Sequence, residues 1–290
     1  MQKQKIRNTG FEAMLISRNV AAVRADQVGN QSCLNFSLGL CGLLLWGMVG
    51  CGMGIAQEET FSRQMGQAQR ALAAKEYSKA IELASAAGEL AGDVPSYLQA
   101  VGETLYRAGA SEKSLEYFDR VVKLQPRSAP YNWQRGLALC SVGRFEDGAE
   151  QFKTHHDVNP DDVENSAWYF LCVAKTKNVE AARKTVIPSR GDGREPMMSI
   201  LKMLQGKLPP EQVVQAAIDN TSDGARRNRA LFYADLYVGL YYDSLGNAGE
   251  AAKYLRRSLA RGDSGYMVDS ARVYLEDRFA KEDKKGSQTK

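Results

Sequence analysis

Apolar residues recur at intervals of three and four along most of the chain from residue 57 onward, which predicts amphipathic helices. Two stretches repeat this pattern in one frame: "GETLYRAGASEKSLEYF" begins at Gly102, and "GLALCSVGRFEDGAEQF" begins at Gly136. Both keep two glycines and a final phenylalanine, whereas most positions between them differ. Because the retained residues are small or apolar and the variable ones are polar, the pattern indicates a structural repeat rather than an active site.

The two stretches start 34 residues apart, and the prolines that follow them, Pro126 and Pro160, keep the same interval. The sequence thereby resembles the tetratricopeptide repeat, a helix-turn-helix unit of that period. In each unit the first glycine lies where the two helices meet, and the second ends the first helix. The predicted fold class is therefore all-α: a tetratricopeptide-repeat helical solenoid with an irregular central helix section and a C-terminal capping helix.

The repeat domain is predicted over residues 57–280. After the regular units, the turn cluster "SRGDGREP" and two further helices, broken at Gly206 and Pro209, precede the last unit. A final amphipathic helix after Gly265 is expected to cap the stack, and the polar residues 281–290 are expected to be a disordered tail. The units are predicted near residues 61–94, 95–128, 129–162, 163–196 (degenerate) and 232–265.

Residues 1–56 read as a separate basic arm and signal or anchor segment. Residues 1–51 carry a net charge of +3 and lead into the stretch Phe36–Ala56, which has no charged residue and six glycines. A basic arm before an apolar segment predicts export, with the positive side left in the cytoplasm. The alternative is a buried core helix, which the six glycines disfavour.

Three outcomes of export remain open from the pattern. "MVGC" resembles a bacterial lipobox, which would make Cys51 the lipidated first residue, although Met48 stands where leucine is usual. "GIA" fits cleavage after Ala56, and an uncleaved segment would stay as an anchor. All three place the body on the periplasmic side, and they leave the N-terminal segment or its lipid as the only membrane contact.

Residues 52–290 lack the sequence features of nucleic-acid-binding proteins, metal sites and enzyme active sites. Residues 52–290 carry a net charge of only +1, which argues against nucleic-acid binding. His155 and His156 are adjacent on a helix and point apart, so a packing role is expected rather than metal binding or catalysis. No cofactor, metal or enzyme activity is predicted. Cys140 and Cys172 lie on apolar helix faces, either as buried free thiols or as a disulfide pair.

Binding is the remaining function, and first helices of such solenoids line a concave groove. Aromatic and arginine side chains on a groove are typical anchors of protein interfaces. The alternative is that irregular helices fold back and bury this face. The candidate partner-binding residues are Gln99, Glu103, Tyr106, Arg107, Trp133, Leu137, Tyr233 and Leu236.

The order of the units resembles the bacterial tetratricopeptide lipoproteins of the new-lipoprotein I type, above all in "WYFLCVAKTKNVEAA", "MLQGKLPPEQVVQ" and "FYADLYVGLYYDSLGNAGEAAKYLRRSLA". This resemblance implies a dimeric envelope lipoprotein that binds envelope proteins or peptides and presents cell-wall hydrolases to a protease. Two alternatives stay open: a structural assembly factor for an outer-membrane or secretion complex, and a cytoplasmic-type enzyme with a false signal.

Overall fold

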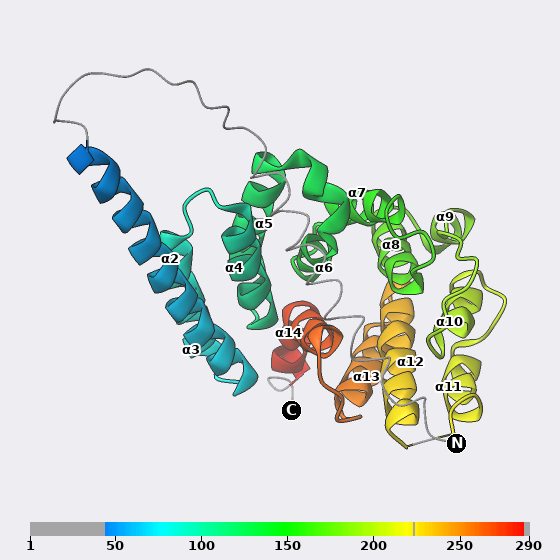
Figure 1. Cartoon of the computed structure of the whole chain (residues 1–290). Coiled ribbons are helices and arrows are strands. Elements are labelled where there is room, and N and C mark those ends of the chain that lie inside the picture. The colour runs from blue at the N-terminus through cyan, green and yellow to red at the C-terminus, as the bar shows by residue number, and fades with distance from the viewer. Residues whose placement is uncertain (1–43, 223, 287–290) are drawn as a thin grey trace, which may run out of the picture. The chain divides into compact units, whose positions relative to one another are not determined.

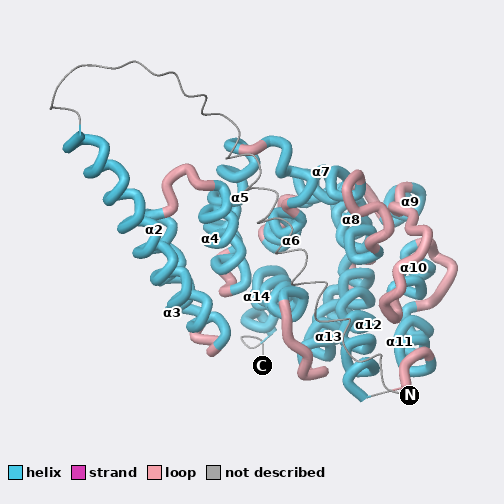
Figure 2. The backbone as a smooth tube through the Cα atoms, viewed as in Figure 1, coloured by secondary structure: helices cyan, strands magenta, loops and turns pink. Residues whose placement is uncertain are grey.

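The structure is a computed structural model that describes residues 44–222 and 224–286, with side chains placed for 57–222 and 224–279. Residues 53–290 form one compact unit, separate from residues 1–52. All regular structure in the described ranges is helical, which confirms the predicted all-α class (Figures 1 and 2).

Most helices form pairs joined by short turns, as the repeat pattern predicts (Figure 1). A short 3-10 helix, η1, leads into the third pair. The pairs are α2 (Leu44–Ala73) with α3 (Tyr77–Leu90), α4 (Pro95–Arg107) with α5 (Ser111–Leu124), α6 (Trp133–Ser141) with α7 (Phe145–His156), α8 (Val163–Thr176) with α9 (Val179–Lys184), α10 (Met197–Leu204) with α11 (Pro210–Asp219), and α12 (Gly224–Ser244) with α13 (Ala248–Leu259); η1 spans Pro126–Tyr131, and α14 (Tyr266–Gly286) follows.

In most pairs the turn between the two helices contains a residue with a left-handed backbone; the α8–α9 turn is the exception. Gly109 (φ 96°) follows α4 and Gly143 (φ 83°) follows α6, which confirms the predicted role of these glycines. The equivalent turn of the first pair uses Lys75 at φ 59°. The first unit therefore forms the same turn and the same helix pair, although it has no glycine at this position.

The glycines inside α4 and α6 make room for an aromatic ring of the next helix. A Cβ on Gly102 would lie 2.8 Å from Phe118 Cε1, and one on Gly136 would lie 2.7 Å from Phe152 Cζ. In each unit the two residues are 16 positions apart. The glycine and the phenylalanine are therefore retained together because they contact each other within one unit.

Replacing one of these glycines should overpack the core. Gly136→Leu would drive a side chain into the Phe152 ring, and we expect a loss of about 1 to 3 kcal/mol in unfolding free energy. The matched control is Gly249→Leu on the exposed side of α13, which should gain up to about 1 kcal/mol from helix propensity. Urea unfolding of both variants measures the effect, and equal stabilities would refute this packing.

The last helix does more than cap the stack. α14 packs against α13, and also against α4 and α6, which are more than 120 residues away in sequence. Arg272 Nη2 donates to the Arg107 carbonyl at the C-terminus of α4, where a cation favours the helix dipole. Tyr274 and Phe279 are buried in the main core. The backbone stays helical to Gly286, so the predicted tail from residue 281 is helical over its first residues.

Candidate functional site

The candidate groove residues of α4 and α6 include several on the face that packs against α14, here called the inner face, and part of this face is core. Tyr106, Leu137 and Leu236 are at most 1% exposed, so their predicted access to a partner is wrong for this conformation. The physical reason is that neighbouring helices, α14 among them, cover positions that would face solvent in an open repeat array. Gln99, Glu103, Arg107 and Trp133 keep partial exposure.

Tyr266, at the start of α14, joins the predicted anchors of α4 and α6. Its ring stacks on Tyr106 with centroids 6.1 Å apart and meets Trp133 edge-on at 4.9 Å. The Arg107 guanidinium lies 5.3 Å from the Tyr266 ring centre, and its Nε donates to Asp269 Oδ2 at 2.7 Å. Tyr106, Arg107 and Trp133 are thus gathered around one residue of α14, which the sequence analysis did not include.

A polar row runs beside these aromatics. Gln99 Nε2 and Gln134 Nε2 both donate to Glu103 Oε1, at 2.8 and 3.0 Å. Burial raises the pKa of Glu103, and the Gln99 hydrogen bond and the Arg107 charge oppose the rise. The Arg107 side chain is 34% exposed. We call Gln99, Glu103, Arg107, Trp133 and Gln134 the inner-face cluster.

The other predicted site residues lie elsewhere. Tyr233 and Leu236 are on α12, which packs chiefly against α8, α11 and α13, and Tyr233 stacks on Tyr237 with centroids 6.3 Å apart. The side chain of Cys51 is outside the described residues. His155 is buried, and its Nδ1 donates to the Pro130 carbonyl at 2.7 Å, which agrees with the expected packing role.

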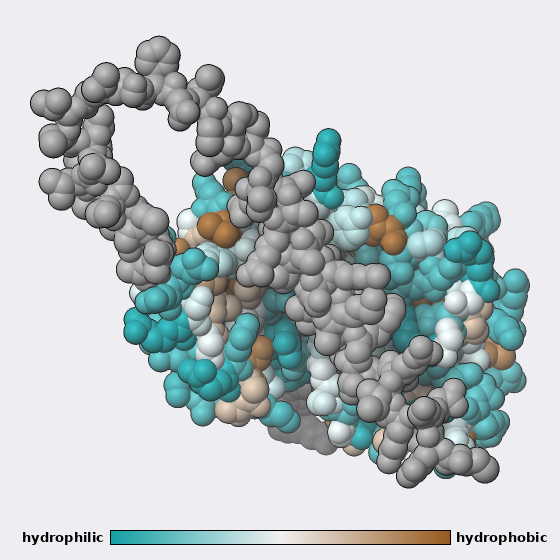
Figure 3. Space-filling model, viewed as in Figure 1, coloured by the Kyte–Doolittle hydropathy of each residue, from teal (hydrophilic) through white to brown (hydrophobic). Residues whose placement is uncertain are grey.

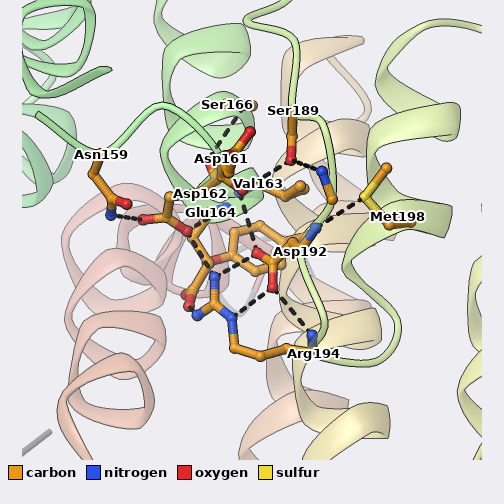
Figure 4. A network of polar contacts seen from close by, with 12 residues as sticks. Asn159, Asp161, Asp162, Val163, Glu164, Ser166, Ser189, Asp192, Arg194 and Met198 are labelled. Carbon is orange, nitrogen blue, oxygen red and sulfur yellow. Dashed lines mark hydrogen bonds and ion pairs between the residues drawn. The ribbon is translucent and has the colours of Figure 1, made fainter. Parts of the chain in front are cut away.

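A second polar cluster, the Arg194 cluster, fastens the irregular section to α8 and α12 (Figure 4). The guanidinium of Arg194 pairs with Asp162 at 2.7 Å, with Asp192 at 2.6 Å and with Glu164. The Tyr237 hydroxyl of α12 also donates to Glu164. Asp162 and Glu164 lie at the start of α8, and Asp192 lies in the loop between α9 and α10, so one arginine joins two segments about 30 residues apart.

The same acidic residues cap α8. The Asp162 carboxylate accepts from the Glu164 backbone N–H at 3.1 Å, as an aspartate at a helix N-cap does. Burial raises the pKa of Glu164 to about 7, with Arg194 opposing the rise and Asp162 adding to it. Because one guanidinium is shared by three carboxylates, it only partly neutralises the negative charge of Glu164. The cluster acts as a structural clamp for the loop before α10.

Glu164 should make stability depend on pH. Its folded pKa of about 7 exceeds the ordinary value of 4.5, so the folded chain holds this proton more tightly than the unfolded chain. Its contribution is therefore full below pH 4.5 and falls as pH rises towards 7. Glu164→Gln should remove that fall, and exposed Glu82→Gln should not. Urea unfolding between pH 5 and 8 measures this, and parallel curves for wild type and Glu164→Gln would contradict it.

No family model matches the chain. Solved structures that it resembles include the MamA protein, at 15% identity and a TM-score of 0.40 over 70% of this chain and 92% of that one. MamA from residue 41 onward, from Desulfovibrio magneticus RS-1, is 14% identical with a TM-score of 0.40, over 70% of this chain and 97% of that one. A tetratricopeptide repeat protein from Parabacteroides merdae ATCC 43184 is 12% identical with a TM-score of 0.40, over 75% and 99%.

These scores are low, and the assignment to the tetratricopeptide fold rests on the 34-residue helix pairs and their glycine–phenylalanine contacts. Among the described side chains, no group of three or more His, Cys, Asp or Glu residues is placed to hold a metal ion. In the same part of the chain, no helix combines the length and apolar character that crossing a bilayer requires.

Proposed function

We propose that this protein is a non-catalytic scaffold that binds other proteins through the inner-face cluster. The observation that carries the proposal is the gathering of Arg107, Trp133 and Glu103 at a partly exposed site on a rigid helical array. Arginine and tryptophan are the side chains that most often dominate protein interfaces. Tyr131, at the end of η1 and two residues before Trp133, is 56% exposed and offers a further aromatic side chain close in sequence to the cluster.

The rest of the visible surface supports a localised site. Where side chains are described on the face in Figure 3, hydrophobic residues form small separate spots within a mostly hydrophilic surface. Such scattered residues are ordinary for a soluble surface and mark no large apolar interface. We therefore assign binding to a few charged and aromatic anchors rather than to a broad apolar patch.

The resemblance to the new-lipoprotein I type favours a finer role: a dimeric adaptor in the bacterial envelope that presents cell-wall hydrolases to a periplasmic protease. The alternative is an assembly factor for an outer-membrane or secretion complex. To separate the two roles, a purified cell-wall hydrolase is incubated with a periplasmic protease, once with this protein and once without it. An adaptor should speed degradation of the hydrolase, whereas an unchanged rate would reject the adaptor role.

Export places the body in the envelope in this proposal. The net charge of +3 over residues 1–51 and the uncharged stretch after it support an export signal, with Cys51 or the N-terminal segment as the membrane attachment. An acyl modification found on Cys51 by mass spectrometry would support the lipoprotein form. A chain recovered from the cytoplasm with residues 1–56 intact would refute export.

Trp133→Ala should weaken partner binding without unfolding the chain. Truncating an aromatic anchor typically costs about 2 kcal/mol, or roughly thirtyfold in affinity. Because Trp133 is only half-buried, at the start of α6, the melting temperature should fall by no more than a few degrees. Lys123→Ala, at an exposed position on α5, is the matched control. Titration of an identified partner checks this, and equal affinities would exclude Trp133 as an anchor.

A further inference from the structure

Cys140 and Cys172 lie side by side in the core, where the regular repeats meet the irregular section. Cys140 is on α6 and Cys172 is on α8, and their Sγ atoms are 3.2 Å apart. Neither side chain has exposed surface. A disulfide bond is about 2.05 Å long, so the two sulfurs need to approach by only about 1 Å to form it.

Helix α7, which lies between α6 and α8 in the chain, has a glycine next to the two sulfur atoms. A Cβ on Gly148 of α7 would lie 2.9 Å from Cys172 Sγ and 3.4 Å from Cys140 Sγ. The repeat pattern usually has alanine four residues before the phenylalanine of the second helix, which is Phe152 here. The third unit therefore lacks a methyl group at the position where that methyl group would press against both sulfurs.

We propose that Cys140 and Cys172 form a disulfide bond that cross-links α6 to α8 when the chain folds under oxidising conditions. The reaction is thiol–disulfide exchange with a donor disulfide, from a protein or from oxidised glutathione. One cysteine thiolate attacks the donor and releases a first thiol, leaving a mixed disulfide. The second cysteine thiolate attacks the cysteine sulfur of that bond and releases a second thiol. The donor gains the two electrons and two protons that the pair loses.

Burial determines when this exchange takes place. The cysteines have no exposed surface, so a donor reaches them only before α7 and α8 have packed. Burial also raises the pKa of the Cys172 thiol, which leaves little reactive thiolate in the folded chain. The bond therefore forms during folding, and a chain already folded with free thiols resists oxidation.

The test is oxidative refolding of the full chain from denaturant in a buffer of reduced and oxidised glutathione. The chain is then denatured without reductant so that buried thiols become accessible, the free thiols are alkylated, and the chain is digested with trypsin. Mass spectrometry should find peptide Gly136–Arg144 linked to peptide Thr154–Lys175. Reduced, folded protein placed in the same buffer should yield both peptides alkylated and unlinked.

The linked chain should melt about 5 to 10 °C above the reduced chain, because the bond restricts the unfolded state. Cys172→Ala is the matched variant, and its melting temperature should not depend on the redox buffer. Recovery of both peptides only as alkylated species after oxidative refolding would overturn the proposal. Linkage of Cys140 or Cys172 to Cys33, Cys41 or Cys51 instead would also overturn it.

Discussion

Tyr106→Ala should lower the unfolding free energy by about 3 to 5 kcal/mol, the range for removing a large aromatic side chain from a core. Tyr106 is fully buried and stacks on Tyr266 of α14, so truncation would open a cavity between α4 and α14. Repeat position alone puts this residue on the open groove, where truncation would affect binding and leave stability intact. Chemical denaturation separates these two expectations directly.

Two matched variants make this result specific. Tyr106→Phe removes only the hydroxyl, which lies 3.5 Å from Ser141 Oγ, and should cost less than about 1 kcal/mol. Trp133→Ala removes the partly exposed neighbour on α6 and should cost less than Tyr106→Ala. If Tyr106→Ala unfolds at the same denaturant concentration as wild type, α14 does not cover the inner face in solution.

Arg194→Met should destabilise the chain by about 2 to 4 kcal/mol, somewhat below the cost of breaking a fully buried ion pair, because Arg194 is 46% exposed. The substitution would leave Asp162, Glu164 and Asp192 without their shared cation. The Asp192 and Glu164 side chains are only 6% and 12% exposed, so solvent compensates them poorly. Urea unfolding at pH 8 measures the loss.

The destabilisation should shrink at low pH, because Glu164, whose pKa burial raises to about 7, becomes protonated and the repulsion among the three carboxylates falls. Arg190→Met is the control from the same loop, since Arg190 is 84% exposed and pairs only with Asp161 in the described contacts. That variant should match wild type. A loss for Arg194→Met that is the same at pH 5 and pH 8 would show that packing, rather than charge, holds the loop.

The helix pairs could be predicted from the sequence because their determinants are local. Gly102 and Phe118 contact each other 16 positions apart, and the same spacing recurs in the next unit. The same spacing holds for a third glycine of this kind, Gly239, where an added Cβ would lie 3.0 Å from Leu255 Cγ. A period read from one chain is enough to place such contacts.

The sequence left burial of the inner face as an alternative to an open groove and did not indicate α14 as the helix that covers it, because this closure depends on contacts without a period. Arg107 meets Asp269 across 162 positions, and nothing in the repeat pattern relates the two residues. The Arg194 cluster is similar: its acidic run and its loop read separately as an ordinary helix cap and an ordinary turn. The sequence left Cys140 and Cys172 open as buried free thiols or a disulfide pair, because the two cysteines occupy different repeat positions and meet only through the packing of α6 on α8.

Site-specific photo-crosslinking tests the central claim, that partners bind at the inner-face cluster, most directly. A photoreactive residue would replace Trp133 in one chain and exposed Lys123 of α5 in another, and both chains would be irradiated in living cells. We predict that position 133 gives a discrete crosslink to an envelope protein, identified by mass spectrometry, and that position 123 does not. Crosslinks from position 123 with none from position 133, in chains that melt like wild type, would contradict the account.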